Sequence, residues 1–158
     1  MFKSLALAIL IVCTAATASA QMGMDLTLNR SMYMQYEPIY ACVTLRNDTG
    51  RPLVFGKNPK LQGFLLFEVT DQRGNVVPKR PGAELSVTGL ILSPGQIKRM
   101  IVPINRYYQL DRIGVYRVHA YVSHSQLPYE YKTKDLKFNV EPGVTVWKRS
   151  VGLPHLQP

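Results

Sequence analysis

The sequence predicts an all-β protein: a sandwich of two antiparallel sheets, with about eight or nine strands in Greek-key order. Three observations support this prediction. Apolar residues alternate with a period of two in almost every stretch, and no window carries a helical stripe longer than a turn or two. Turn-forming Gly, Pro, Asn and Asp residues separate these stretches at short intervals. Two sheets packed face to face would bury the apolar side of each strand.

The first half of the chain contains four predicted strands, at residues 25–29, 39–45, 64–70 and 76–77. The second places every other residue from Ile39 to Leu45 on one face, and it stops at the turn-forming residues 47–50. The third is apolar on both faces, which is typical of a central strand. Residues 71–75 predict a hairpin loop between the third and fourth strands.

The second half predicts four more strands, at residues 90–92, 97–104, 114–123 and 129–140. A Pro94-Gly95 turn separates the first two, and Glu141-Pro142-Gly143 ends the last. We therefore expect a β-sandwich domain over residues 21–143. Residues 144–158 form a C-terminal tail that contains the only tryptophan, Trp147.

A loop that ends at Gly114 is followed two residues later by Tyr116, at the start of a late alternating strand. In immunoglobulin-like domains, a Tyr at this place turns its hydroxyl back onto the backbone of the preceding loop. We therefore predict an Ig-like sandwich, with a structural role for Tyr116.

Turn and core residues also resemble those of a known group of domains. The pattern is Val43-x-Leu45-x-Asn47, Thr49-Gly50-x-Pro52-Leu53, Phe67-x-Val69-x-Asp71-x-x-Gly74, Leu92-x-Pro94-Gly95 and Gly114-x-Tyr116-x-Val118. Over roughly residues 25–141 it resembles bacterial Ig-like accessory domains, among them macroglobulin-type domains and proteinase-inhibitor-like sandwiches. The resemblance implies the fold and leaves the activity open, because its residues build the scaffold. The sequence carries neither a thioester motif nor an inhibitory loop of those families.

The first twenty residues have the pattern of a secretory signal peptide. Lys3 precedes a short apolar run, and small residues then lead to Ala18-Ser19-Ala20. We expect cleavage after Ala20 and a periplasmic or secreted bacterial protein. Cys13 would be discarded with the leader, so Cys42 would be the only cysteine left, and an intrachain disulfide would be impossible. No later apolar segment approaches the roughly 20 residues that span a bilayer.

Without its leader the chain has 18 basic and 10 acidic residues, an excess of +8. Such an excess favours anionic partners such as lipid headgroups or acidic glycans, through an attraction that salt weakens. Scattered charge that keeps an exported domain soluble is the plainer interpretation. The sequence contains no nucleic-acid recognition motif, and we expect no nucleic-acid partner.

Tyrosines offer a second type of contact, because each combines an apolar ring with a polar tip and is favoured at interfaces. We predict a binding surface formed by Tyr107, Tyr108, Tyr129, Tyr131, Lys98 and Arg99. Its partner would be an envelope protein or an anionic envelope surface. Pairing of a partner strand with a free sheet edge is a second possible mode.

Two Met-x-Met pairs support an alternative function. Residues two apart on a strand share a face, and thioethers select Cu(I). The alternative is therefore a periplasmic Cu(I)-binding protein, with Met22, Met24, Met32, Met34 and His119 as ligands. Otherwise Met32 and Met34 fill the core, Met22 and Met24 belong to an unordered terminus, and we expect no cofactor.

We predict no enzymatic activity. The nucleophile elbow, the zinc-protease helix motif and the phosphate-binding loop are all missing from the sequence. Cys42 lies in the middle of a predicted strand and would need a His partner to act as a nucleophile. The sequence thus favours a non-catalytic exported binding module.

Overall fold

The computed structural model describes residues 22–145 and 147–149. The predicted leader (1–20) and the end of the tail (150–158) lie outside the described residues. Within those that are described, the protein is all-β, with two short 3-10 turns, η1 (Pro59–Leu61) and η2 (Ile104–Arg106). None of its described helices is long and apolar enough to cross a membrane.

One layer of the sandwich is a three-stranded antiparallel sheet, in the order β1 (Met22–Leu28), β3 (Tyr40–Asn47) and β7 (Ile97–Pro103). The burial of β3 alternates strictly, with Ala41, Val43 and Leu45 fully buried. This alternation confirms the face predicted from the sequence. It arises because the β-branched and aliphatic residues at these positions pack well on a pleated, half-buried surface.

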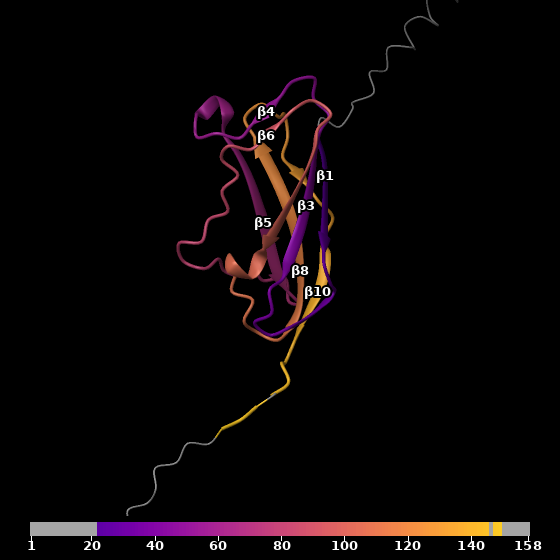
Figure 1. Cartoon of the computed structure of the whole chain (residues 1–158), viewed down its shortest axis with the longest axis vertical. Helices are drawn as coiled ribbons and strands as arrows, with labels where there is room; N and C mark the ends of the chain where they lie inside the picture. The colour runs from indigo at the N-terminus through magenta and orange to yellow at the C-terminus, as the bar shows by residue number, and fades with distance from the viewer. Residues whose placement is uncertain (1–21, 146, 150–158) are drawn as a thin grey trace, which may run out of the picture.

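The second layer has the order β2 (Met32–Met34), β10 (Leu136–Glu141), β8 (Gly114–His124) and β5 (Gly63–Asp71), with β9 (Tyr131–Lys132) also paired to β8. All its pairs are antiparallel except β2 with β10. Successive strands mostly change sheet, as a Greek-key sandwich requires (Figure 1).

The structure differs from the predicted strands in several places. No predicted strand corresponds to β2, and the predicted strand 76–77 is reduced to an isolated bridge between Val76 and Thr70. A small extra sheet pairs β4 (Leu53–Val54) with β6 (Ile91–Leu92) at one end of the sandwich (Figure 1). The last predicted strand, 129–140, is split into β9 and β10, because the Thr133 hydroxyl between them takes the place of a ladder partner and accepts the Ala120 N–H. β5 is an edge strand of its sheet, although its apolar pattern predicted a central one.

The core lies between the two layers. Its largest fully buried side chains are Tyr33, Phe55, Phe138, Ile39, Leu45, Leu53, Leu65, Leu92 and Ile104. Phe138 stacks on Tyr116 at 5.5 Å between ring centroids and meets Tyr33 edge-on at 5.9 Å. The Tyr116 hydroxyl donates to the Arg112 carbonyl at 2.7 Å, which confirms the predicted corner.

Asn47 ends β3 and holds three segments together through six hydrogen bonds. Its Nδ2 donates to the carbonyls of Arg51 and Leu92, at 2.9 and 2.7 Å. Its Oδ1 accepts from the backbone N–H and the hydroxyl of Thr49. Its backbone N–H donates to Gln96, and its carbonyl accepts from Gly95. The side chain is fully buried, and each of its polar atoms has a partner.

We predict that Asn47→Ala lowers the free energy of unfolding by about 3 kcal/mol, because it leaves the Leu92 carbonyl and the Thr49 N–H buried without partners. Urea unfolding measures the change, provided that the dependence of the free energy of unfolding on urea concentration is the same in both proteins. Asn75→Ala is the control, since the side-chain amide of Asn75 makes a single hydrogen bond, to the exposed Asp71 carboxylate. Equal losses in the two variants would contradict the role given to Asn47.

Candidate binding groove beside strand β5

The free edge of β5 is covered by other segments at both ends. Towards its end, Val77 donates to the Val69 carbonyl and Asp71 donates to the Asn75 carbonyl. Before its start, Gly56 is bridged to Gln62. The middle, residues 63–67, is left open along the side of the sandwich.

The loop that follows Val77 turns away from β5 and returns to the body of the protein near Phe55, a residue that precedes β5 in the sequence. Its first part is held to residues 107–109, because Arg80 donates to the Tyr107 carbonyl and Gln109 donates to the Pro78 carbonyl. Gly82, with φ at +70°, then turns the chain outward. The loop comes back where Gly89 donates to the carbonyl of Phe55. Figure 1 shows it standing out beside β5.

Between this loop and β5 lie two adjoining hollows, of about 500 and 320 Å³. They share Phe64, Glu84 and Leu85, so together they form one groove, which we call the β5 groove. Its other main lining residues are Lys57, Gly63, Leu66, Lys79, Arg80, Val87, Tyr107 and Tyr108. Phe64 and Leu66 point outward from β5, and Phe64 keeps 46% of its surface exposed.

Gly63, where the open edge begins, has no room for a side chain. A Cβ there would lie 2.5 Å from the Phe55 ring and 2.6 Å from the His124 ring. These two rings meet edge-on, with centroids 4.9 Å apart, directly beneath the strand. The close approach of backbone and rings fixes the height of β5 at this end of the groove.

Tyr108 lies in the core and only borders the groove, so the sequence prediction of an exposed contact residue is corrected here. It is 4% exposed, and its hydroxyl donates to the Phe67 carbonyl on the free edge of β5. Burial raises the pKa of Tyr108 to about 12, so the hydroxyl keeps its proton and donates throughout the physiological range.

Arg80 fixes the wall of the groove. Its Nε donates to the Asn105 carbonyl at 3.0 Å, and its guanidinium contacts the Asp111 carboxylate at 2.6 Å. Lys57 and Lys79, by contrast, are exposed, and neither takes part in an ion pair among the described residues. Glu84 is the single acidic residue among those that line the groove. The groove is therefore apolar along β5 and basic at its rim.

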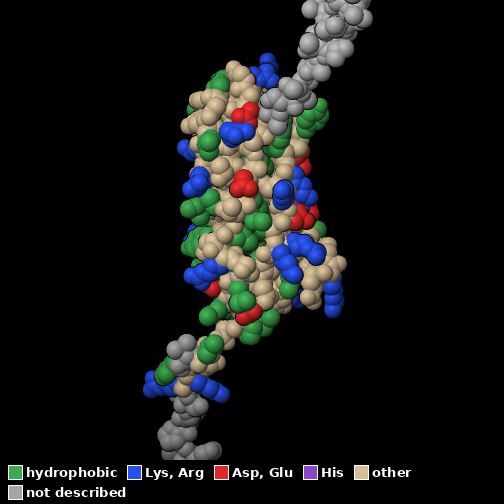
Figure 2. Space-filling view, turned by 90° about the vertical axis from the view of Figure 1, so that its right-hand side faces the viewer, with side chains coloured by type: hydrophobic (Ala, Val, Ile, Leu, Met, Phe, Trp, Pro, Cys, Tyr) green, Lys and Arg blue, Asp and Glu red, His purple; other side chains and the backbone are tan. Residues whose placement is uncertain are grey.

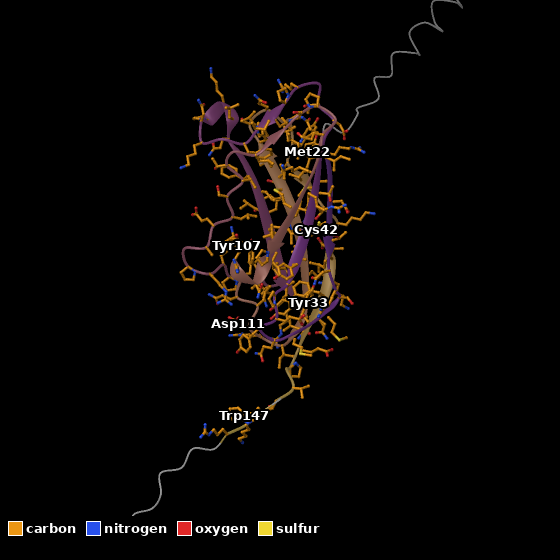
Figure 3. All side chains as sticks on the ribbon, viewed as in Figure 1. Met22, Tyr33, Cys42, Tyr107, Asp111 and Trp147 are labelled. Carbon is orange, nitrogen blue, oxygen red and sulfur yellow. The ribbon has the colours of Figure 1, made fainter. Side chains whose placement is uncertain are left out.

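The predicted tyrosine and basic residues do not form one surface. Tyr107 is half-buried in the β5 groove (Figure 3), whereas Tyr131 is on β9, which pairs with β8 on the side away from β5. Tyr129 is 74% exposed in the preceding loop. The strand topology separates them, because β8 lies between β9 and β5.

Lys98 and Arg99 lie on β7, at the edge of the other sheet. They pair with Leu45 and Thr44 respectively, so they point to opposite faces and form no common contact. Lys98 is on the core-facing side of an edge strand, where a charge discourages pairing with another chain. On the face seen in Figure 2, Lys and Arg side chains are spread along the molecule and alternate with acidic ones.

The copper hypothesis predicted five ligands, which the structure does not bring together. Met22 and Met24 lie in β1, where Met22 is 2% exposed in the core. Met32 and Met34 are 55% and 56% exposed on the outer face of the other sheet, because Tyr33 between them occupies the core. The roles expected for the two pairs are thus reversed. Met22 and Tyr33 lie at different heights of the sandwich (Figure 3).

His119 is also distant from the exposed methionines. Met32 pairs with Asn139, which pairs with Val115, four residues before His119. Four residues rise by roughly 13 Å, and two strand spacings add roughly 10 Å across the sheet. His119 instead has its Nδ1 3.2 Å from the Asp135 carboxylate and its Nε2 3.9 Å from that of Glu68. In the part of the chain that the structure describes, no three His, Cys, Asp or Glu side chains converge on a possible metal position.

Sequence reasoning missed Phe64, Leu66, Leu85 and Lys79 as candidate site residues. A signal was present, since β5 is apolar on both faces. This pattern predicts a central strand, whereas the outward residues of β5 line a groove beside an edge strand. Periodicity alone cannot distinguish these cases, because both keep water from the outer face.

No family model matches the sequence, and no curated protein matches it. Among solved structures, the fold is similar to part of a family 123 glycoside hydrolase from Clostridium perfringens, at 14% identity and a TM-score of 0.49 over 79% of this chain. It is also similar to the CARDB domain of the PF1109 protein from Pyrococcus furiosus, which was solved in complex with di-metal ions. The identity is 13% and the TM-score is 0.45 over 76% of this chain. A third similar structure is that of the DNA glycosylase AlkC of Pseudomonas fluorescens, at 14% identity and a TM-score of 0.43 over 83% of this chain.

The chain spans 28% of the glycoside hydrolase, 33% of the glycosylase and 87% of the CARDB domain. These likenesses concern the β-sandwich architecture. They assign neither an activity nor a ligand to this chain.

Alkaline titration tests the position of Tyr108. Burial disfavours the charged phenolate and raises the folded-state pKa of Tyr108 to about 12, above its usual value near 10. The neutral hydroxyl therefore contributes stability that is fully present below pH 10 and is lost as the pH rises towards 12. We predict that Tyr108→Phe lowers stability by about 1 kcal/mol at neutral pH and makes the fall between pH 10 and 12 shallower. Urea unfolding at each pH measures both effects. Tyr129→Phe, at an exposed position, should keep the original slope. If stability falls as steeply between pH 10 and 12 in Tyr108→Phe as in the original chain, the Tyr108 hydroxyl is not buried as described.

Proposed function

We propose that this chain is a non-catalytic, exported Ig-like binding domain that holds a protein of the bacterial cell envelope through the β5 groove. The groove is the observation that carries the proposal. It combines an apolar floor from Phe64 and Leu66 with a basic rim at Lys57 and Lys79. Concave apolar sites with a few polar groups at their edge are the usual form of binding sites. The leader pattern over residues 1–20 supports export to the periplasm or the medium.

The excess of +8 supports a contribution from long-range attraction. Such attraction accelerates association with an acidic partner and weakens with salt, whereas apolar contacts in the groove resist salt. An anionic envelope surface is the second partner class that this charge admits. The two classes differ in their response to salt and to substitutions in the groove.

Affinity capture with the immobilised chain from Gln21 to Pro158 tests the proposal. We predict that it retains one dominant protein from an envelope extract of its own organism, and that retention persists at high salt. Phe64→Asp should weaken this retention at least about tenfold, a loss of about 1.4 kcal/mol, because it places a charge on the apolar floor. Thermal unfolding confirms that each variant is folded.

Ile101→Asp is the matched control, since Ile101 is an exposed apolar strand residue on β7 and lies outside the lining of the groove. It should retain the same protein. Equal weakening by both substitutions would contradict the groove. Binding only to vesicles of anionic lipid, lost at high salt and lost with Lys98→Glu and Arg99→Glu, would assign the function to the basic residues of β7 instead.

A further inference from the structure

The geometry of the β5 groove points to a particular mode of binding: a partner segment in extended conformation is added to β5 as an extra strand, with acidic side chains flanking the paired residues. We propose this mode from the backbone groups that β5 presents and from the charges at the two ends of the groove. It rests on the proposed function, because it specifies the partner of the same groove.

The hydrogen bonds of β5 show on which side of the strand each backbone N–H and C=O group points. The Val69 carbonyl accepts from Val77, so it points away from β8, and the Gln62 carbonyl accepts from Ser125 on the opposite side. Because the direction alternates along a strand, the N–H and C=O groups of Leu65 and the N–H of Phe67 point into the groove. These three groups have no hydrogen-bond partner among the described residues.

The open window is short and bounded at both ends. Tyr108 occupies the Phe67 carbonyl, and the Gly56 bridge covers Gln62. Residues 63–67 extend over roughly 13 Å, which matches a paired segment of about five residues. The backbone of another extended chain supplies donors and acceptors at this spacing, and recognition by strand addition uses such an edge.

The groove walls specify the side chains of the segment. Phe64 and Leu66 lie on the outer side of the edge, and Leu85 and Tyr107 face them across the groove. They favour an apolar side chain at alternate positions of the bound strand. Lys79 lines the larger hollow and Lys57 lines the smaller one, so a cation stands towards each end. An acidic residue on either side of the apolar stretch complements both.

Amide hydrogen exchange of the free chain, from Gln21 to Pro158, is the first test. We predict that the Leu65 and Phe67 amides exchange faster than those of Leu66 and Glu68, although Leu65 and Phe67 are the more buried side chains. The reason is that the two even-numbered amides are bonded to β8 and the two odd-numbered ones face the groove. Equal protection of all four would show that the edge is closed, and would overturn strand addition.

Selection from a library of random peptides of about eight residues, displayed on phage, is the second test. We expect enriched peptides to alternate β-branched or aromatic residues and to carry Asp or Glu near their ends. At ten times its Kd, an enriched peptide should slow exchange at Leu65 and Phe67 roughly tenfold and leave Leu66 unchanged. N-methylation of its alternate amides should abolish the protection, because it removes the donors that pair with β5.

Charge reversal at the groove provides the specificity control. Lys57→Glu with Lys79→Glu should weaken the acidic peptides at least about tenfold and shift a new selection towards Lys and Arg. Lys98→Glu with Arg99→Glu makes the same change of net charge on β7 and should leave peptide affinity unchanged. If the enriched peptides carry no acidic residues, or if the two double variants change peptide affinity equally, the proposal of an acidic partner is overturned.

The outcomes separate this proposal from the function beneath it. If no peptide is enriched, or if binding protects no β5 amide while Phe64→Asp still abolishes capture, the groove binds its partner without an added strand and this inference is wrong. If Phe64→Asp affects neither capture nor peptide binding, the proposed function fails as well. Association of the chain with itself that competes with the peptides would show that a second copy is the occupant, and would also overturn the inference.

Discussion

The position of the groove depends on the hydrogen bonds of one buried amide, that of Asn47. This residue fixes the turn after β3 through Thr49 and Arg51, and it holds the end of β6 through the Leu92 carbonyl. Just before β6, the Leu90 carbonyl accepts from the Phe55 N–H, and the Gly89 N–H donates to the Phe55 carbonyl. The returning end of the groove loop is therefore tied through β6 to the end of β3. The other end is tied by Arg80 to Asp111. Because both ends are anchored, the loop can stand away from β5 without losing its place.

Edge strands show how the fold limits unwanted pairing. β7 carries Lys98 on its core-facing side and Arg99 on its outer side, so an approaching strand would meet a charge on either face. β5 is protected differently, by Val76 and Val77 at one end, by Gly56 at the other and by the Tyr108 hydroxyl in between. These elements leave one short open window in a strand that is otherwise covered. The contrast between the two edges supports the interpretation of the window as a functional feature.

Much of the fold was predictable from local patterns. The alternation of β3 and β8, the Tyr116 corner and the turn at Asn47 all depend on residues close in sequence, and each was found as expected. The motif residues Asn47, Leu92 and Gly95 were recognised as a pattern, and the structure adds the reason that they occur together, since Asn47 bonds to the other two. Their joint occurrence is a packing requirement of one buried polar network.

The candidate site was far less predictable, because it depends on which strands become neighbours. Tyr107 and Tyr108 are adjacent in sequence, yet Tyr107 is half-buried in the groove, whereas Tyr108 lies in the core and only borders the groove. The hydroxyl of Tyr108 is turned towards the edge of β5, where it donates to the Phe67 carbonyl. Composition shows that a chain is rich in tyrosine, but it does not reveal whether a neighbouring loop covers a given ring. The methionines show the same limit, since the face of β1 that turns inward is set by its register against β3.

The charge at the groove bears on whether its occupant is another copy of this chain. If two copies paired through β5 about a two-fold axis near Leu65, Lys57 of each would approach Lys79 of the other, because the two lysines line opposite ends of the groove. Like charges repel each other where they approach within a Debye length, about 8 Å at physiological salt. The formal net charge of the chain, +9, adds to this repulsion. An acidic extended segment meets the same backbone groups and is attracted by both lysines. The electrostatics therefore disfavour self-pairing through the open edge of β5 and favour a different, acidic chain.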